Sequence, residues 1–114
     1  MISIDLLNEL QSKIKDLEIS VKELRKSGTN YAQAERDYKI LLRTECLKLR
    51  DEGMAIGMID KTCYGLPSVA EARFKRDVAR TVYEANQDAI NSLKLQIRVI
   101  EAQINREWNT NLND

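Results

Sequence analysis

The sequence predicts an all-α protein, built as a long antiparallel helical hairpin or coiled-coil bundle of three long helices plus one short helix. The composition is typical of long amphipathic helices, with 32% charged residues and only 5% aromatic residues. Helix breakers are few, and all but Gly28 of the four Gly and one Pro lie between residues 53 and 67. No window alternates in the manner of a β-strand. We therefore expect the 114 residues to form a single helical domain, 1–114.

The first helix is expected over residues 3–27, with Ser3 as a plausible N-cap. Its apolar residues follow an uninterrupted pattern of alternating three- and four-residue steps, which is typical of a coiled-coil seam. They are Leu7, Leu10, Ile14, Leu17, Val21 and Leu24.

Gly28 marks the expected end of this helix. Asn30 can cap a second helix over residues 31–52, with Gln33 at the capping-box position. So short a connection favours an antiparallel hairpin. The alternative is one bent helix that runs through Gly28. We favour the hairpin.

After Gly53, a short helix is expected at 55–62 and a long helix at 68–108. Ser68 and Glu71 form a Ser-x-x-Glu capping box, which marks a helix start. The long helix carries one predicted apolar stripe, which comprises Val78, Val82, Ala85, Ala89, Leu93, Ile97, Ile100 and Ile104. Phe74, one turn before Val78, is expected in the core.

The predicted helices differ in length, and this difference predicts self-association. The first two would reach roughly 35 Å and the last roughly 60 Å, at about 1.5 Å per residue. Part of the long apolar stripe would then be exposed to water, and exposed apolar patches of this kind mark interaction surfaces. We expect a homodimer, because cyclic dimers are the commonest oligomers. The expected contact residues are Ala89, Leu93, Ile97, Ile100, Ile104 and Trp108.

The residue types argue against catalysis. The chain has no His, no Gly-rich phosphate loop, and two cysteines, Cys46 and Cys63, without a base to activate them. We expect no enzyme activity, no cofactor and no metal. The cysteines fit two buried thiols in a reducing compartment, and no segment resembles a signal peptide or a membrane span. The expected location is therefore the cytoplasm, with no membrane partner.

A nucleic-acid partner is a possible alternative. The turn from Tyr64 to Pro67 would suit a helix-turn-helix, and basic residues cluster around it. They are Lys61, Arg73, Lys75, Arg76 and Arg80. Against this, the chain has no net charge, and acidic neighbours such as Asp77 can pair with these bases on an ordinary solvated face. We favour the solvated face.

Four segments carry a resemblance to a known family: YAQAERDYK from Tyr31, LKLRDEG from Leu47, AEARFKRDVA from Ala70, and Ile97 through Trp108. They resemble small, uncharacterised helical proteins encoded by phages and prophages of Gram-positive bacteria. This resemblance covers most of the chain from Tyr31 onward. It implies an accessory protein in the host cytoplasm, made during phage infection, and transfers no catalytic motif.

The function that we expect is non-enzymatic: a self-associating phage accessory protein that acts by protein–protein contact. Its partner would be a host or phage protein, and inhibition of a host defence system such as CRISPR is one such role. The alternative is a nucleic-acid-binding accessory factor of phage replication or recombination. A purely structural phage component is a third reading.

Overall fold

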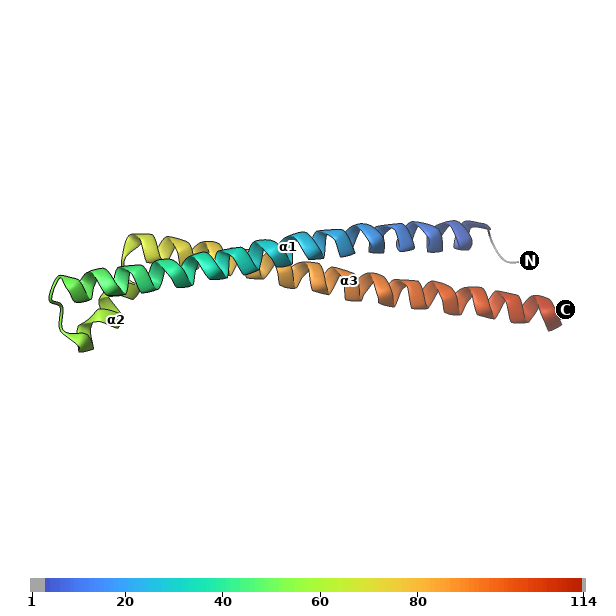
Figure 1. The fold of residues 1–114 in the computed structure, drawn as a ribbon. Helices are drawn as coiled ribbons and strands as arrows, with labels where there is room; N and C mark the ends of the chain where they lie inside the picture. The colour runs from blue at the N-terminus through green and yellow to red at the C-terminus, as the bar shows by residue number, and fades with distance from the viewer. Residues whose placement is uncertain (1–3, 114) are drawn as a thin grey trace. The chain divides into compact units, whose positions relative to one another are not determined.

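The fold is all-α. It is seen in a computed structural model that describes residues 4–113, with side chains described for residues 4–110. The chain forms α1 (Ile4–Asp51), α2 (Ile56–Tyr64) and α3 (Pro67–Asn113), and no strand occurs in the described residues. The predicted fold class, a long helical hairpin without strands, is confirmed (Figure 1). The expected N-cap, Ser3, lies outside the described residues.

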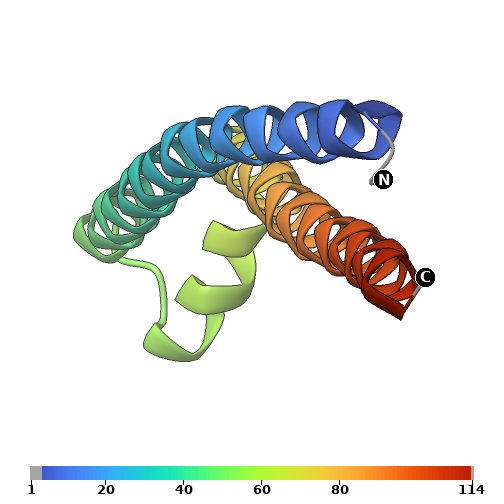
Figure 2. The same ribbon diagram turned by 90° about the vertical axis from the view of Figure 1, so that its right-hand side faces the viewer.

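The chain divides into two compact units. Unit 1 comprises residues 1–25 and 84–114, and unit 2 comprises residues 26–83. Within unit 2, α2 lies beside the end of α1 and the start of α3, as both ribbon views show (Figures 1 and 2). Within unit 1, the first half of α1 runs beside the second half of α3.

The predicted break at residues 28–30 is wrong, because α1 continues through Gly28 as one helix of 48 residues. The alternative reading, in which a single helix passes through Gly28, is the one that holds. Packing does not require glycine here, because a Cβ built on Gly28 would lie at an ordinary contact distance, 3.8 Å, from a ring carbon of Tyr83. Glycine can occupy a helix interior at a cost of about 1 kcal/mol relative to Ala, which packing of so long a helix offsets.

The predicted stop at Gly53 is confirmed. Gly53 has φ +89°, the left-handed conformation that glycine adopts without strain, directly after α1 ends. The short helix is also present, but it begins one residue later than predicted and ends two residues later, at Tyr64. α3 begins at Pro67 rather than Ser68 and continues to Asn113 rather than 108. Ser68 is thus inside the first turn, and Pro67 takes the first helical position, where its missing N–H costs nothing.

The core of unit 2 lies where its three helices meet. Tyr38 from α1, Cys63 from α2 and Val69 from α3 are its buried members. Partly buried side chains surround them: Leu41, Leu42, Cys46, Leu49, Leu66 and Ala72. Since each helix supplies one buried residue, this cluster ties α2 to both long helices.

The inward-facing line of α3 differs from the predicted stripe. Side chains with reduced exposure recur every seven residues at Val69, Arg76, Tyr83, Ile90, Ile97 and Ile104. By contrast, Val78, Val82, Ala85 and Ala89 are exposed. The predicted stripe advanced 26 residues in seven steps, about 3.7 residues per step. The inward-facing line repeats every seven residues, which corresponds to two steps of about 3.5 residues. The stripe therefore starts outside and joins the inward-facing line only from Leu93 onward.

Candidate interaction surface

Three arginines of α3 pack against tyrosines inside unit 2. The guanidinium carbon of Arg73 lies 4.7 Å from the ring centre of Tyr64, and Arg73 donates a hydrogen bond of 3.1 Å to the Tyr64 carbonyl. Arg80 lies over Tyr31 and donates to its hydroxyl at 3.2 Å. Cation–π contacts of this kind join the helices and occupy the guanidinium faces.

Arg76 is more enclosed than Arg80, with its side chain 16% exposed against 42% for Arg80. It lies 4.5 Å from the Tyr38 ring centre and forms ion pairs with Asp77 at 2.9 Å and with Glu35 of α1 at 3.7 Å. The positive charge of this guanidinium is therefore balanced inside the chain by two carboxylates and a ring. It is a structural contact between α1 and α3.

The predicted nucleic-acid face is therefore not assembled. Arg73, Arg76 and Arg80 point toward the tyrosines, and only Lys61 and Lys75 of the five predicted residues are exposed. The spacing argument placed the arginines correctly on one side of α3. It failed because that side faces the other helices, where arginine stems cover aromatic rings.

The predicted self-association residues divide in a similar way. Ile100 is buried, and Leu93, Ile97 and Ile104 are partly buried in unit 1, where α3 and the first half of α1 are the described helices. Ala89 and Trp108 are exposed. Four of the six predicted self-association residues are thus at least partly covered within the chain.

The length argument for a homodimer fails as well. α1 has 48 residues and α3 has 47, so no long helix outruns its partner. The 60 Å stripe was left uncovered only because α1 was divided at Gly28 in the prediction. Any surface for self-association has to be sought elsewhere.

An apolar strip of three side chains remains exposed on α3 in unit 2. Phe74, Val78 and Val82 are 62%, 46% and 48% exposed, four residues apart. The expected core position of Phe74 is wrong, because the inward-facing line runs through Arg73 and Arg76. Large exposed apolar residues spaced along one helix face are typical of a contact surface.

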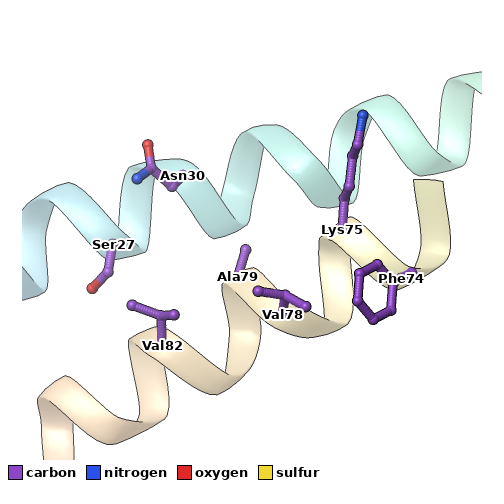
Figure 3. Close-up of a pocket in the computed structure, with 7 residues that line it drawn as sticks. All are labelled: Ser27, Asn30, Phe74, Lys75, Val78, Ala79 and Val82. Atoms are coloured by element: carbon purple, nitrogen blue, oxygen red, sulfur yellow. The ribbon is translucent and has the colours of Figure 1, made fainter. Parts of the chain in front are cut away.

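The strip borders a hollow of about 240 Å³ between α1 and α3 (Figure 3). Its lining is formed by Ser27 and Asn30 of α1 together with Phe74, Lys75, Val78, Ala79 and Val82 of α3. Figure 3 shows Ser27 pointing toward Val82 and Lys75 extending from α3 toward α1. The hollow is thus polar along α1 and, apart from Lys75, apolar along α3. Sequence reasoning missed it because it assigned the strip to the core.

The two cysteines lie together on α1 and α2. Cys63 is fully buried and donates a long hydrogen bond of 3.4 Å to the Leu42 carbonyl. Burial, the adjacent Cys46 thiol and the nearby carboxylates of Glu45 and Asp60 raise the pKa of the Cys63 thiol to about 11. A thiol with so high a pKa is a poor nucleophile at neutral pH.

Within the described residues, no group of three or more His, Cys, Asp or Glu side chains could hold a metal ion. None of the described helices is long and apolar enough to cross a membrane. Comparison with protein-family models, curated proteins and solved structures gives no match. The resemblance to a phage family therefore stays a prediction.

Proposed function

We propose that this protein acts without catalysis, as a binding protein whose apolar strip receives an amphipathic helix of another protein. The observation that carries this proposal is the exposed row of Phe74, Val78 and Val82 beside the hollow. Three anchors four residues apart span roughly 12 Å of helix, which matches the spacing of apolar positions on a docked helix. A host or phage protein is the class of partner that we propose.

Lys75 supports a particular chemistry for this partner. It is exposed at the edge of the hollow, and no carboxylate of the described residues lies within ion-pair distance of its ammonium group. An acidic residue beside the apolar positions of the incoming helix would pair with it. Such a rim pair contributes mainly to specificity and association rate.

Nucleic acid is not proposed as the partner. The guanidinium groups of Arg73, Arg76 and Arg80 are held by tyrosines, carbonyls and carboxylates of the chain itself. Phosphate binding through them would require breaking those contacts. Two exposed lysines on a protein of zero net charge are a weak electrostatic footprint.

The test uses synthetic helical peptides with leucines at i, i+4 and i+7 and either Glu or Lys at the flanking positions. We expect the Glu series to bind, measured by fluorescence polarisation, and V78D to weaken binding at least about tenfold because it buries a charge in an apolar contact. I19D is the matched control, since Ile19 is also exposed but lies in unit 1. Absence of binding by every peptide, or equal binding by V78D, would contradict the proposal.

A further inference from the structure

The zero net charge of the chain hides a separation of charge between the two units. Unit 2 contains 11 basic and eight acidic residues, and unit 1 contains seven basic and ten acidic residues. Their formal charges are therefore +3 and −3. A neutral molecule with two oppositely charged parts attracts its own copies, because the positive part of one matches the negative part of another.

Unit 2 presents a basic face on α1, made of Ile40, Arg43, Leu47 and Arg50. Steps of three and four residues place the four side chains on one side of the helix, and all are exposed. The face adjoins two shallow hollows of about 320 and 400 Å³, which share Arg43 and Leu47. Ile56 of α2, 82% exposed, extends the apolar surface.

The arginines of this face lack ion-pair partners. No carboxylate of the described residues lies within 4.0 Å of Arg43 or Arg50, although Asp60 lines the same hollow. By contrast, Lys39 on the neighbouring turn of α1 is paired with Glu35 at 3.3 Å. Unpaired guanidiniums between exposed Ile and Leu side chains suit a surface that is both acidic and apolar.

Unit 1 presents such a surface on α3, the acidic face of Glu84, Asp88, Leu95 and Val99. Successive members of this face are four, seven and four residues apart, which keeps them on one side of the helix. All four are exposed, and Leu95 and Val99 are each 60% exposed. Neither Glu84 nor Asp88 has a cationic partner among the described residues.

We infer that the protein self-associates by packing the basic face of one copy against the acidic face of a second copy. Arg43 and Arg50 pair with Glu84 and Asp88 of the other copy, and the aliphatic side chains of the two faces come into contact. The inference does not depend on the apolar strip. It also moves self-association from Leu93, Ile97 and Ile104, which the chain covers itself, to a different side of α3.

A second copy fits the basic face better than a nucleic acid does. The apolar members, Ile40, Leu47 and Ile56, have no role against a phosphate backbone, and no aromatic side chain lies among them for base stacking. The chain itself carries the matching acidic surface at equal concentration.

The decisive experiment is a charge swap, measured by light scattering after size exclusion. One variant is R43E/R50E and the other is E84R/D88R. In the first, both faces of every copy are acidic, and in the second both are basic, so each variant alone should dissociate at least about tenfold more readily than the wild type. A mixture in equal amounts restores opposite charges at both kinds of contact. We expect the mixture to regain the mass of the wild-type assembly.

Circular dichroism of each variant confirms that the helices persist, and K26E/K61E is the matched control. It makes the same charge change on exposed lysines of unit 2 outside the basic face, so it should assemble like the wild type. High salt should weaken the wild-type assembly.

Three results would overturn the inference. The wild type could remain at the monomer mass of 13.1 kDa at roughly 200 µM, where micromolar association is detected. Either double variant could assemble as the wild type does. The mixture of the two variants could fail to reach a larger mass than either variant alone.

Loss of peptide binding by V78D with normal assembly would separate this inference from the proposed function. A short DNA duplex that binds the wild type but not R43E/R50E would assign the basic face to nucleic acid.

Discussion

Tyr38 occupies the centre of the unit 2 core, and its hydroxyl is buried without a hydrogen-bond partner among the described residues. The nearby Tyr64 side chain and burial raise the pKa of Tyr38, while Arg73 and Arg76 lower it less, so the hydroxyl stays protonated at neutral pH. Tyr38→Phe should therefore leave the protein equally stable or stabilise it by up to about 1 kcal/mol, because no bond is lost. Urea unfolding measures the change.

Tyr31→Phe is the matched control for that variant. The Tyr31 hydroxyl accepts a hydrogen bond from Arg80 at 3.2 Å, so its removal should destabilise the fold by about 0.5–1 kcal/mol. If Tyr38→Phe were the more damaging of the two, the Tyr38 hydroxyl would have to be hydrogen-bonded in solution.

Cys63 and Cys46 should differ sharply toward iodoacetamide. With its pKa at about 11, only about one Cys63 thiol in a thousand is ionised at pH 8, and the side chain is also fully buried. Cys46 is partly exposed at the edge of a hollow. Mass spectrometry of native protein should show Cys46 modified first. Modification of Cys63 should accelerate as pH rises toward 11, because the thiolate is the reactive form.

C46S isolates the second thiol. In that variant, Cys63 should remain unmodified under native conditions and react in urea. Rapid labelling of Cys63 in folded C46S at pH 8 would contradict both the burial and the raised pKa.

At the scale of the helix, two glycines should respond in opposite directions to alanine. Gly28 is helical without a positive φ, and an added Cβ would meet Tyr83 at ordinary contact distance, 3.8 Å. Gly28→Ala should stabilise the protein by about 0.5–1 kcal/mol through helix propensity. Gly53, at φ +89°, should lose about 1 kcal/mol as alanine because of backbone strain. Thermal unfolding of the two variants compares them directly.

A destabilising Gly28→Ala would show that α1 and α3 approach more closely at Gly28 than 3.8 Å allows. A neutral Gly53→Ala would show that the end of α1 adopts another turn in solution.

The helices were predictable from the sequence to different degrees. Gly53 and Pro67 defined two boundaries well, because positive φ and a missing N–H act locally. Gly28 led to a wrong prediction of a helix end, since the sequence alone does not distinguish a glycine inside a helix from a glycine at its end. The inward-facing line of α3 was missed where it passes through Arg76 and Tyr83, residues that hydrophobicity alone assigns to the surface.

The surfaces were less predictable than the helices. The sequence identified arginines around one turn but could not show which tyrosines contact them. Tyr31 and Tyr38 are distant in the chain from Arg80 and Arg76, and the contact of Tyr64 with Arg73 depends on how α2 packs against α3. The opposite charges of the two units also depend on which residues pack together. A charge count along the chain is zero until the units are defined.

For the whole molecule, the two units should differ in local stability although α1 passes through both. In unit 2, Cys63 and Val69 are fully buried in a cluster to which three helices contribute side chains. In unit 1, the buried apolar side chains among the described residues are Ile90 and Ile100, each 6% exposed. An amphipathic helix owes its stability mainly to packing, so α1 should open more readily where its contacts are fewer.

Hydrogen exchange followed by mass spectrometry measures this difference within one helix. After correction for intrinsic rates, amides of residues 35–46 should exchange at least about tenfold more slowly than those of residues 6–17. The R43E/R50E variant provides the control for self-association, because it retains the unit 2 core but loses the basic face. If the wild type alone showed the gradient, assembly would be its cause. Equal protection along α1 in both proteins would mean that the helix opens as one cooperative element, and the division into units would then have no energetic counterpart.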